Sequence, residues 1–181
     1  MKKAAWKKYP LFLIPIGIFI LLVVHFSTNS RLEDNRRLSN ESPSSQEVVG
    51  KHLASFTMRN INGTSYSTQE EITGKCLFVF FSASDCAVCL TESKYWQMLH
   101  ISATTKVLGV TRDKNLNKLK RFLDLYKITF PVLHDQQGKL FSELKIEHTP
   151  VKILIDGNKI IRKIDQTTYM DEGDFKKSLY F

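Results

Sequence analysis

Two cysteines separated by two residues are the most chemically informative feature of this 181-residue chain. Cys86 and Cys89 follow a continuous apolar run over residues 76–81 and open a segment, residues 87–101, whose apolar positions have helical spacing. A thiol at a helix N-terminus lies near backbone N–H groups that favour negative charge, so its pKa can fall from about 8.5 to about 3.5–7.5. The second thiol lies one turn further on, where it can close a disulfide ring. The spacing therefore predicts thiol–disulfide exchange.

Two other interpretations of the cysteine pair are weaker. The pair could supply half of a zinc site, but the third cysteine, Cys76, lies inside the apolar run, and the sequence has no second CxxC and no HxxxH. A purely structural disulfide is the other interpretation, although a disulfide that closes so small a ring at a helix start is an unusual way to stabilise a fold. Redox chemistry is favoured over both, and neither a metal nor another cofactor is expected. Cys76 is interpreted as core packing, at the end of the sheet opposite the active site.

The elements that must position the thiols alternate between strands and helices. Hairpins are expected around Asn62-Gly63 and Gly157-Asn158, which are strong turn signals. The remaining predicted strands cover residues 76–81, 106–111 and 130–133, and the predicted helices cover residues 87–101, 116–126, 139–145 and 171–180. A βαβαβ run that ends in an antiparallel hairpin predicts an α/β fold, with a central mixed sheet flanked by helices.

The N-terminal part of the chain is predicted to lie outside this domain. Residues 1–8 contain four lysines and are expected to form a cytoplasmic basic tail, whereas residues 9–30 contain no Asp, Glu, Lys or Arg. An apolar helix of this length approaches the hydrocarbon thickness of about 30 Å. Residues 9–26 are therefore predicted to be a transmembrane signal-anchor, and residues 27–46, rich in Ser, Asn, Arg and Glu, a flexible linker. Residues 47–181 form the predicted domain.

Charge sets the predicted topology. Lysines before the apolar run hold that end in the cytoplasm. The domain is then on the extracytoplasmic (periplasmic) side of the inner, cytoplasmic membrane, as a single-pass protein. A cleaved signal peptide is the alternative, but no convincing cleavage site follows the apolar run, and both interpretations export the domain.

The net charge of +8 does not indicate nucleic-acid binding. Four of the basic residues lie in the first eight positions, and the densest basic run of the domain, residues 114–121, has the spacing of a solvated helix face. A nucleic-acid platform would interleave basic residues with exposed aromatic side chains, whereas most aromatic residues here lie in apolar strand runs. No nucleic-acid partner is expected.

Taken together, these motifs resemble the TlpA-type thiol–disulfide oxidoreductases of the thioredoxin superfamily, which are membrane-tethered and related in fold to the redoxins. The resemblance covers the whole domain and rests on a set of short motifs. They are Val49-Gly50-Lys51, the Asn62-Gly63 hairpin, Gly74-Lys75, the CxxC at a helix start, residues 130–135 with Gly138-Lys139, and Thr149-Pro150 before residues 152–157. It implies a thioredoxin-like fold with an N-terminal β-hairpin and an inserted strand and helix.

The resemblance also implies roles for individual residues. Cys86 corresponds to the attacking thiolate and Cys89 to the resolving thiol, joined as a disulfide when oxidised. Thr149 and Pro150 match a substrate-binding loop whose X–Pro bond is cis, the one kind of peptide bond for which cis is inexpensive. Glu92 matches an acidic residue that handles the proton of the second cysteine in relatives that reduce other proteins. Without the resemblance, Glu92 would be interpreted as a solvated helix residue. The implied partners are a protein thiol or disulfide substrate and a membrane or extracytoplasmic redox partner.

Some positions depart from the family pattern. Asp85 precedes the first cysteine in place of tryptophan, and its carboxylate disfavours a neighbouring thiolate. His148 is expected to lie near the thiols and partly offset Asp85, or else to be a solvated loop residue. Two other function classes stay open at this stage, a thiol peroxidase and a redox-inert tethered binding domain. A peroxidase would need Thr and Pro where this chain has Ala83 and Val79. A protein-disulfide reductase is the favoured function.

Overall fold

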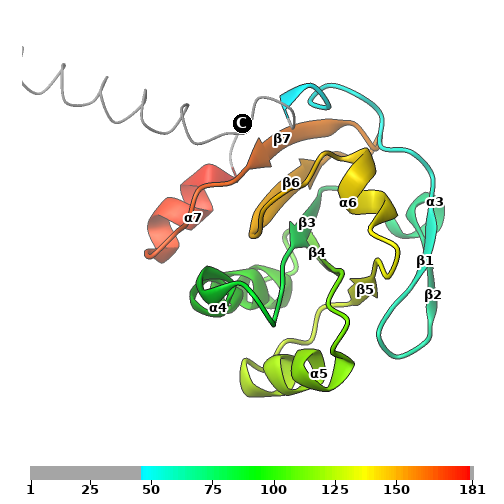
Figure 1. Ribbon diagram of the computed structural model, residues 1–181. Helices are drawn as coiled ribbons and strands as arrows, with labels where there is room; N and C mark the ends of the chain where they lie inside the picture. The colour runs from blue at the N-terminus through cyan, green and yellow to red at the C-terminus, as the bar shows by residue number, and fades with distance from the viewer. Residues whose placement is uncertain (1–45, 180–181) are drawn as a thin grey trace, which may run out of the picture. The chain divides into compact units, whose positions relative to one another are not determined.

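The computed structural model describes residues 46–179, which form the strands and helices shown in Figure 1. The strands are β1 (Thr57–Arg59), β2 (Ser65–Ser67), β3 (Cys76–Phe80), β4 (Lys106–Thr111), β5 (Val132–His134), β6 (Val151–Ile155) and β7 (Ile161–Asp165). The helices are α3 (Thr68–Glu71), α4 (Ala87–Ile101), α5 (Leu116–Leu125), α6 (Lys139–Glu143) and α7 (Glu172–Ser178).

A five-stranded mixed sheet lies at the centre of the domain, in the order β5-β4-β3-β6-β7. Strands β3, β4 and β5 are parallel, whereas β6 pairs antiparallel with β3 and with β7. The register of β6 on β3 pairs Phe80 with Val151. The segment that follows β3 and the segment that precedes β6 therefore meet at one end of the sheet.

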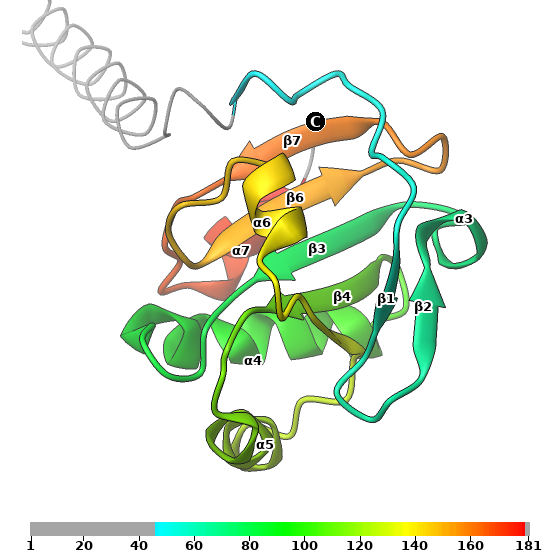
Figure 2. The same cartoon turned by 45° about the vertical axis from the view of Figure 1, so that its right-hand side comes forward.

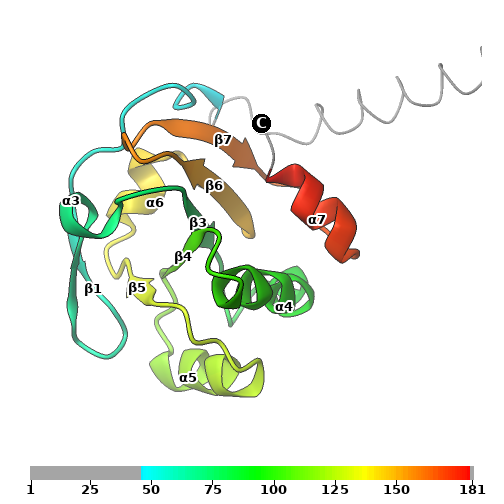
Figure 3. The same ribbon diagram turned by 180° about the vertical axis from the view of Figure 1, so that it is seen from behind.

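Helices and loops cover both faces of the sheet, which explains why β3 is buried along its whole length. Leu77, Val79 and Phe81 pack with side chains of α4, α5 and α7, including Trp96. The alternate residues, Phe78 and Phe80 among them, pack on the other face with α6 and the N-terminal segment. Figure 2 shows α6 and the β1–β2 hairpin on one side of the sheet and α4 and α5 on the other, and Figure 3 shows the same layers from behind. The alternation follows from the two-residue period of a strand.

The predicted N-terminal hairpin is present as the short strands β1 and β2. Gly63 has a φ of +89°, which a residue with a Cβ adopts poorly, and it closes the turn between β1 and β2. Strand β2 ends at Ser67 because the Ser67 side chain accepts the Gln69 N–H and caps α3, a short helix that the sequence pattern did not predict. The hairpin attaches to the main sheet through the Ile61 N–H, which donates to the Val132 carbonyl at 3.0 Å.

The predicted α/β fold with a central mixed sheet and flanking helices is confirmed. The predicted basic tail and membrane anchor, residues 1–8 and 9–26, and nearly all of the predicted linker lie outside the described residues. Within residues 46–179, no helix is both long and apolar enough to cross a membrane.

Candidate active site

The two neighbouring cysteines form a disulfide at the N-terminus of α4. Cys86 is the N-cap residue, its Sγ lies 2.07 Å from that of Cys89, and the Cys89 N–H donates to Cys86 Sγ at 3.1 Å. The Cys86 residue is 9% exposed, whereas Cys89 is completely buried. An incoming thiol or thiolate can therefore reach only the Cys86 side of the bond, and the Cys89 N–H is placed to stabilise a Cys86 thiolate after reduction.

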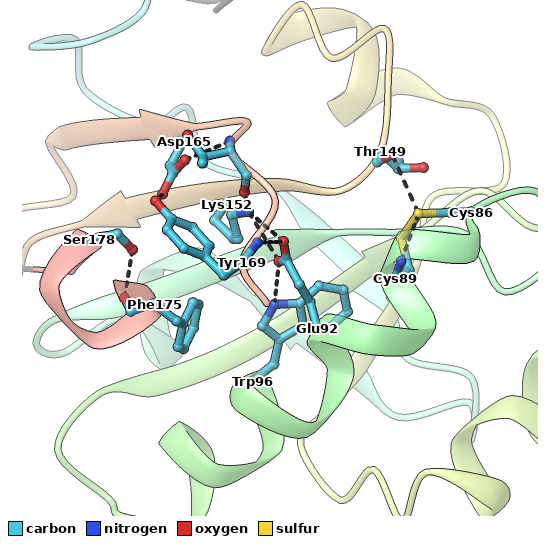
Figure 4. Close-up of polar contacts among 11 residues, drawn as sticks. Cys86, Cys89, Glu92, Trp96, Thr149, Lys152, Asp165, Tyr169, Phe175 and Ser178 are labelled. Atoms are coloured by element: carbon cyan, nitrogen blue, oxygen red, sulfur yellow. Dashed lines mark hydrogen bonds and ion pairs between the residues drawn. A yellow bond between two sulfur atoms is a disulfide. The ribbon is translucent and has the colours of Figure 1, made fainter. Parts of the chain in front are cut away.

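The Thr149–Pro150 loop lies directly against the disulfide. The Thr149–Pro150 peptide bond is cis, and the Thr149 carbonyl oxygen lies 3.4 Å from Cys86 Sγ (Figure 4). The sheet accounts for this contact between residues 63 positions apart, because Val151 pairs with Phe80 at the end of β3. The structure thus brings the Thr149–Pro150 bond to Cys86, the more accessible of the two cysteines.

A cavity of 580 Å³ opens beside the disulfide. Asp85, His148 and Thr149 all line it, together with Ser84 and Arg112. Both Asp85 and His148 are exposed to solvent. The structure therefore places the two predicted tuning residues on one polar cavity at the active site.

Glu92 is completely buried, which overturns the interpretation of this residue as a solvated helix glutamate. Three different groups donate hydrogen bonds to its carboxylate (Figure 4). The Tyr169 N–H lies 2.7 Å from Oε1, and Lys152 Nζ and Trp96 Nε1 lie 3.1 Å and 3.3 Å from Oε2. Burial raises the pKa of the Glu92 carboxyl, and Lys152 and the two N–H donors oppose that shift.

Lys152 is a residue of this site that sequence reasoning missed. It lies in β6, all of whose residues are buried, and is itself only 2% exposed. The signal was present in the sequence as a single lysine inside the apolar run Val151–Ile155. A buried ammonium needs an anionic partner, so such a lysine indicates a carboxylate nearby in the fold.

Asp113 is the second missed residue, and it holds the loop that leads to Cys86. This buried carboxylate accepts hydrogen bonds from the Ser82 hydroxyl at 2.7 Å, from the Ala83 N–H at 2.6 Å and from the Thr111 hydroxyl at 3.0 Å. The Ser82 oxygen in turn accepts the Asp85 N–H at 3.1 Å. Asp113 lies two residues after the end of β4, so the network fixes the start of α4 to the neighbouring strand.

Cys76 lies away from this chemistry. It is a free, buried thiol at the first position of β3, whereas the disulfide follows the last position of that strand. Burial raises the pKa of the Cys76 thiol to about 12. The structure confirms the prediction that Cys76 packs in the core at the opposite end of the sheet.

Two curated relatives cover most of the chain. A protein of Oceanobacillus iheyensis named thiol-disulfide oxidoreductase ResA is 28% identical over 168 residues, which are 88% of this chain and 83% of the relative. A Yersinia pestis protein named thiol:disulfide interchange protein DsbE is 27% identical over 175 residues, 94% of this chain and 87% of the relative. Both names support the enzyme class that the sequence predicts.

The fold is also that of known thiol–disulfide enzymes. A secreted Mycobacterium tuberculosis disulfide oxidoreductase, described as homologous to E. coli DsbE, superposes with a TM-score of 0.62. The match covers 68% of this chain and 93% of that structure, at 13% identity. The shared fold is thioredoxin-like. The AhpC/TSA family model matches residues 49–164, more than half of the chain. This chain belongs to the AhpC/TSA family.

Proposed function

We propose that this protein is an extracytoplasmic thiol–disulfide oxidoreductase of the TlpA, ResA and DsbE kind that reduces disulfides of other proteins. The observation that carries the proposal is the asymmetry of the Cys86–Cys89 disulfide. Cys86, 9% exposed, is the more accessible of the two cysteines and lies beside the Thr149 carbonyl, whereas Cys89 is completely buried. Such a pair is suited to forming a mixed disulfide at one sulfur and resolving it with the other.

In the proposed cycle, the reduced protein attacks a substrate disulfide with the Cys86 thiolate. Backbone groups of Thr149 and Pro150 bind the substrate chain beside the mixed disulfide. Cys89 then attacks Cys86 Sγ, which restores the Cys86–Cys89 disulfide and releases the substrate thiol. Glu92 takes the proton of Cys89. Burial raises the pKa of its carboxyl above the ordinary glutamate value, which makes the carboxylate a stronger base for that role. Asp85 and His148 tune the stability of the Cys86 thiolate.

We also propose that residues 9–26 anchor the protein in the cytoplasmic membrane, with residues 1–8 inside and the domain outside. The apolar composition of residues 9–26 and the four lysines before them support this topology. The neighbour from M. tuberculosis is described as secreted, which is consistent with a domain that works outside the cytoplasm. A membrane or extracytoplasmic redox partner would return electrons to the disulfide. A reporter enzyme that is active only in the cytoplasm, fused after Phe181, should be silent, and strong activity would refute the topology.

The activity is tested with the purified full-length chain. In the presence of dithiothreitol it should accelerate the reduction of insulin disulfides, and Cys86→Ser should abolish the acceleration. If the Cys86→Ser variant behaves like the wild type, the domain is redox-inert and binds partners only by its surface. A Cys89→Ser variant should accumulate a mixed disulfide on Cys86, and mass spectrometry of that adduct in cells identifies the substrate.

A thiol peroxidase is the other chemistry found in a family of this name, and the site does not favour it. The positions where a peroxidase needs threonine and proline are occupied by Ala83 and Val79, and Val79 is an inward-facing core residue of β3. Turnover of hydrogen peroxide by the dithiol-reduced protein, at a rate that exceeds insulin reduction, would reverse this assignment.

A further inference from the structure

Lys152 is a buried cation that connects the strand after the cis-proline with the helix that carries the cysteines. Its ammonium lies 3.1 Å and 3.4 Å from the two carboxylate oxygens of Glu92, and it also donates to the Thr167 carbonyl. The side chains of Lys152 and Glu92 are 1% and 0% exposed. A buried ion pair often stabilises the folded protein no more than an apolar pair of the same shape would. Stability alone therefore does not account for the charges at these two positions.

The surroundings of Glu92 fit its ionised form. The carboxylate acts only as an acceptor in its hydrogen bonds. Its donors are the Tyr169 N–H in the segment after β7, Trp96 Nε1 of α4 and the Lys152 ammonium of β6. Lys152 also faces β7, where Asp165 is its partner in the strand register and accepts a hydrogen bond from the Tyr169 hydroxyl at 2.6 Å. Asp165 is thus a second carboxylate beside Lys152 in the sheet.

Glu92 also lies on the same face of α4 as Cys89, three residues further along the helix. Residues three apart on a helix lie on the same face, with Cβ atoms about 5–6 Å apart. Cys89 is completely buried, so its thiol needs an internal group to take its proton. Figure 4 shows Glu92 between the disulfide and the cluster of Lys152 and Tyr169. The carboxylate is the acidic side chain that lies closest along α4 to Cys89.

We propose that Lys152 is a positioning residue that keeps Glu92 ionised, so that Glu92 can accept the Cys89 proton when the mixed disulfide is resolved. This inference rests on the proposed oxidoreductase function. The Cys89 S–H bond breaks and its proton moves to the Glu92 carboxylate. The Cys89 thiolate attacks Cys86 Sγ, a new S–S bond forms, and the old S–S bond breaks with its electron pair on the substrate sulfur. Glu92 then returns the proton, through solvent, to the substrate thiolate.

The role of Lys152 follows from two opposing effects on Glu92. Burial raises the pKa of the carboxyl, and the ammonium of Lys152 lowers it. Without that ammonium, burial raises the pKa of Glu92 further, and the carboxyl keeps its proton to higher pH. A protonated Glu92 cannot act as a base for Cys89. Resolution of the mixed disulfide would then be slow at neutral pH and recover only at higher pH.

The test follows the reaction of the reduced full-length chain with 5,5′-dithiobis(2-nitrobenzoate). Attack by Cys86 releases one thionitrobenzoate, and resolution by Cys89 releases the second, so the two steps are recorded separately. Lys152→Met should move the acid limb of the second release to higher pH by about one unit, so that at a pH below that limb the second release is about tenfold slower than in the wild type. The first release should change little. Lys163→Met is the matched control, because Lys163 is a lysine of β7 that donates to a main-chain carbonyl, that of Ser178.

A double-mutant cycle separates this role from a structural one. In a Glu92→Gln background, Lys152→Met should have almost no further effect on the second release, because both changes remove the same base. Equal slowing in both backgrounds, equal slowing of both releases, or an unshifted pH profile would overturn the proposal. A wild-type chain that gives no second release refutes the oxidoreductase function itself, whereas a normal wild-type reaction with unaffected variants refutes only the role of Lys152.

A measurement on the wild type covers the case in which Lys152→Met does not fold. The carboxyl carbon resonance of Glu92 in ¹³C-labelled reduced protein reports its ionisation directly. It is assigned by its absence in Glu92→Gln/Lys152→Met, in which two neutral side chains replace the ion pair. We expect an ionised carboxylate at pH 7, and a protonated carboxyl at that pH would overturn the proposal.

Discussion

The carboxylate of Asp113 accepts a hydrogen bond from the Ser82 hydroxyl at 2.7 Å and thereby joins the end of β4 to the loop that precedes Cys86. The same carboxylate accepts the Ala83 N–H and the Thr111 hydroxyl. Since all of these partners donate, an acceptor-only side chain is required at this position. Asp113 thus holds the loop before Cys86 in place through hydrogen bonds to Ser82 and Ala83.

Asp113→Asn tests this arrangement with a nearly isosteric side chain. The amide NH₂ would face a donor and leave at least one buried group unpaired, which costs about 1–3 kcal/mol of the free energy of unfolding. Urea denaturation measures that loss, and Asp124→Asn on the exposed side of α5 is the control, with an expected change within about 0.5 kcal/mol. The rate at which reduced Cys86 is alkylated should also change, because the loop before it loosens. An unchanged midpoint and an unchanged rate would mean that the loop is held by other contacts.

The three cysteines should differ strongly in reactivity. In the structure, Cys86 at the start of α4 is 9% exposed, Cys89 is completely buried, and Cys76 is buried with a pKa raised to about 12. Alkylation requires the thiolate and access to it. Mass spectrometry of a time course with iodoacetamide at pH 8 should therefore find Cys86 modified first and Cys76 last. Faster modification of Cys89 than of Cys86 would reverse the roles assigned to the two thiols.

Gly109 offers a test of packing beneath the active site. A Cβ added at Gly109 of β4 would lie 2.9 Å from Phe81 Cε1, closer than real Cβ contacts, and 3.0 Å from Phe130 Cε2, which is also unusually close. The Phe81 ring is buried against Trp96 and Phe122, so it has little freedom to move. Gly109→Ala should lower the free energy of unfolding by about 1–3 kcal/mol, the usual effect of overpacking. The control is Gly74→Ala, where an added Cβ has nothing within 4 Å, and an equal loss in both variants would exclude the clash as the cause.

Local patterns in the sequence were sufficient to predict the layers of this fold and the pair of thiols. The apolar run at residues 76–81 predicted β3, and the spacing after Cys89 predicted α4, because each pattern reflects contacts within one element. The burial of Glu92 was not predictable in this way. It depends on Lys152 and on the Tyr169 N–H, which come from segments 60 and 77 residues further along the chain. Single-sequence periodicity carries no information on which segments fold over a helix face.

The pH dependence of stability provides a test of the burial of Glu92. Burial raises its pKa in the folded protein, so the folded state holds this proton to higher pH than the unfolded chain, in which a glutamate has a pKa of about 4.3. The stability from this group is fully present below the unfolded pKa and is lost as the pH rises through the folded pKa. Relative to Glu92→Gln/Lys152→Met, the wild-type free energy of unfolding should therefore fall as the pH rises above about 4. A relative increase in urea titrations would show that Lys152 outweighs burial.

Asp85 is the departure from the family pattern that bears most directly on the direction of electron flow. It is exposed, directly precedes Cys86 and lines the same cavity as His148. With an effective dielectric constant of about 20, a like charge about 6–7 Å from the Cys86 thiolate disfavours it by about 2 kcal/mol, before screening by solvent and salt. The helix N-terminus contributes a favourable effect of similar size.

Asp85→Asn should therefore stabilise the Cys86 thiolate and with it the reduced form of the protein. The midpoint of thiolate absorbance against pH should move down by at most about one unit. The reduction potential should rise by up to about 30 mV, since that is the equivalent of 1.4 kcal/mol for a two-electron couple. A glutathione redox titration measures the potential, and Asp124→Asn is the control for a general change in charge. If Asp85→Asn leaves both quantities at their wild-type values, the carboxylate is fully screened by solvent, and another group sets the potential of this disulfide.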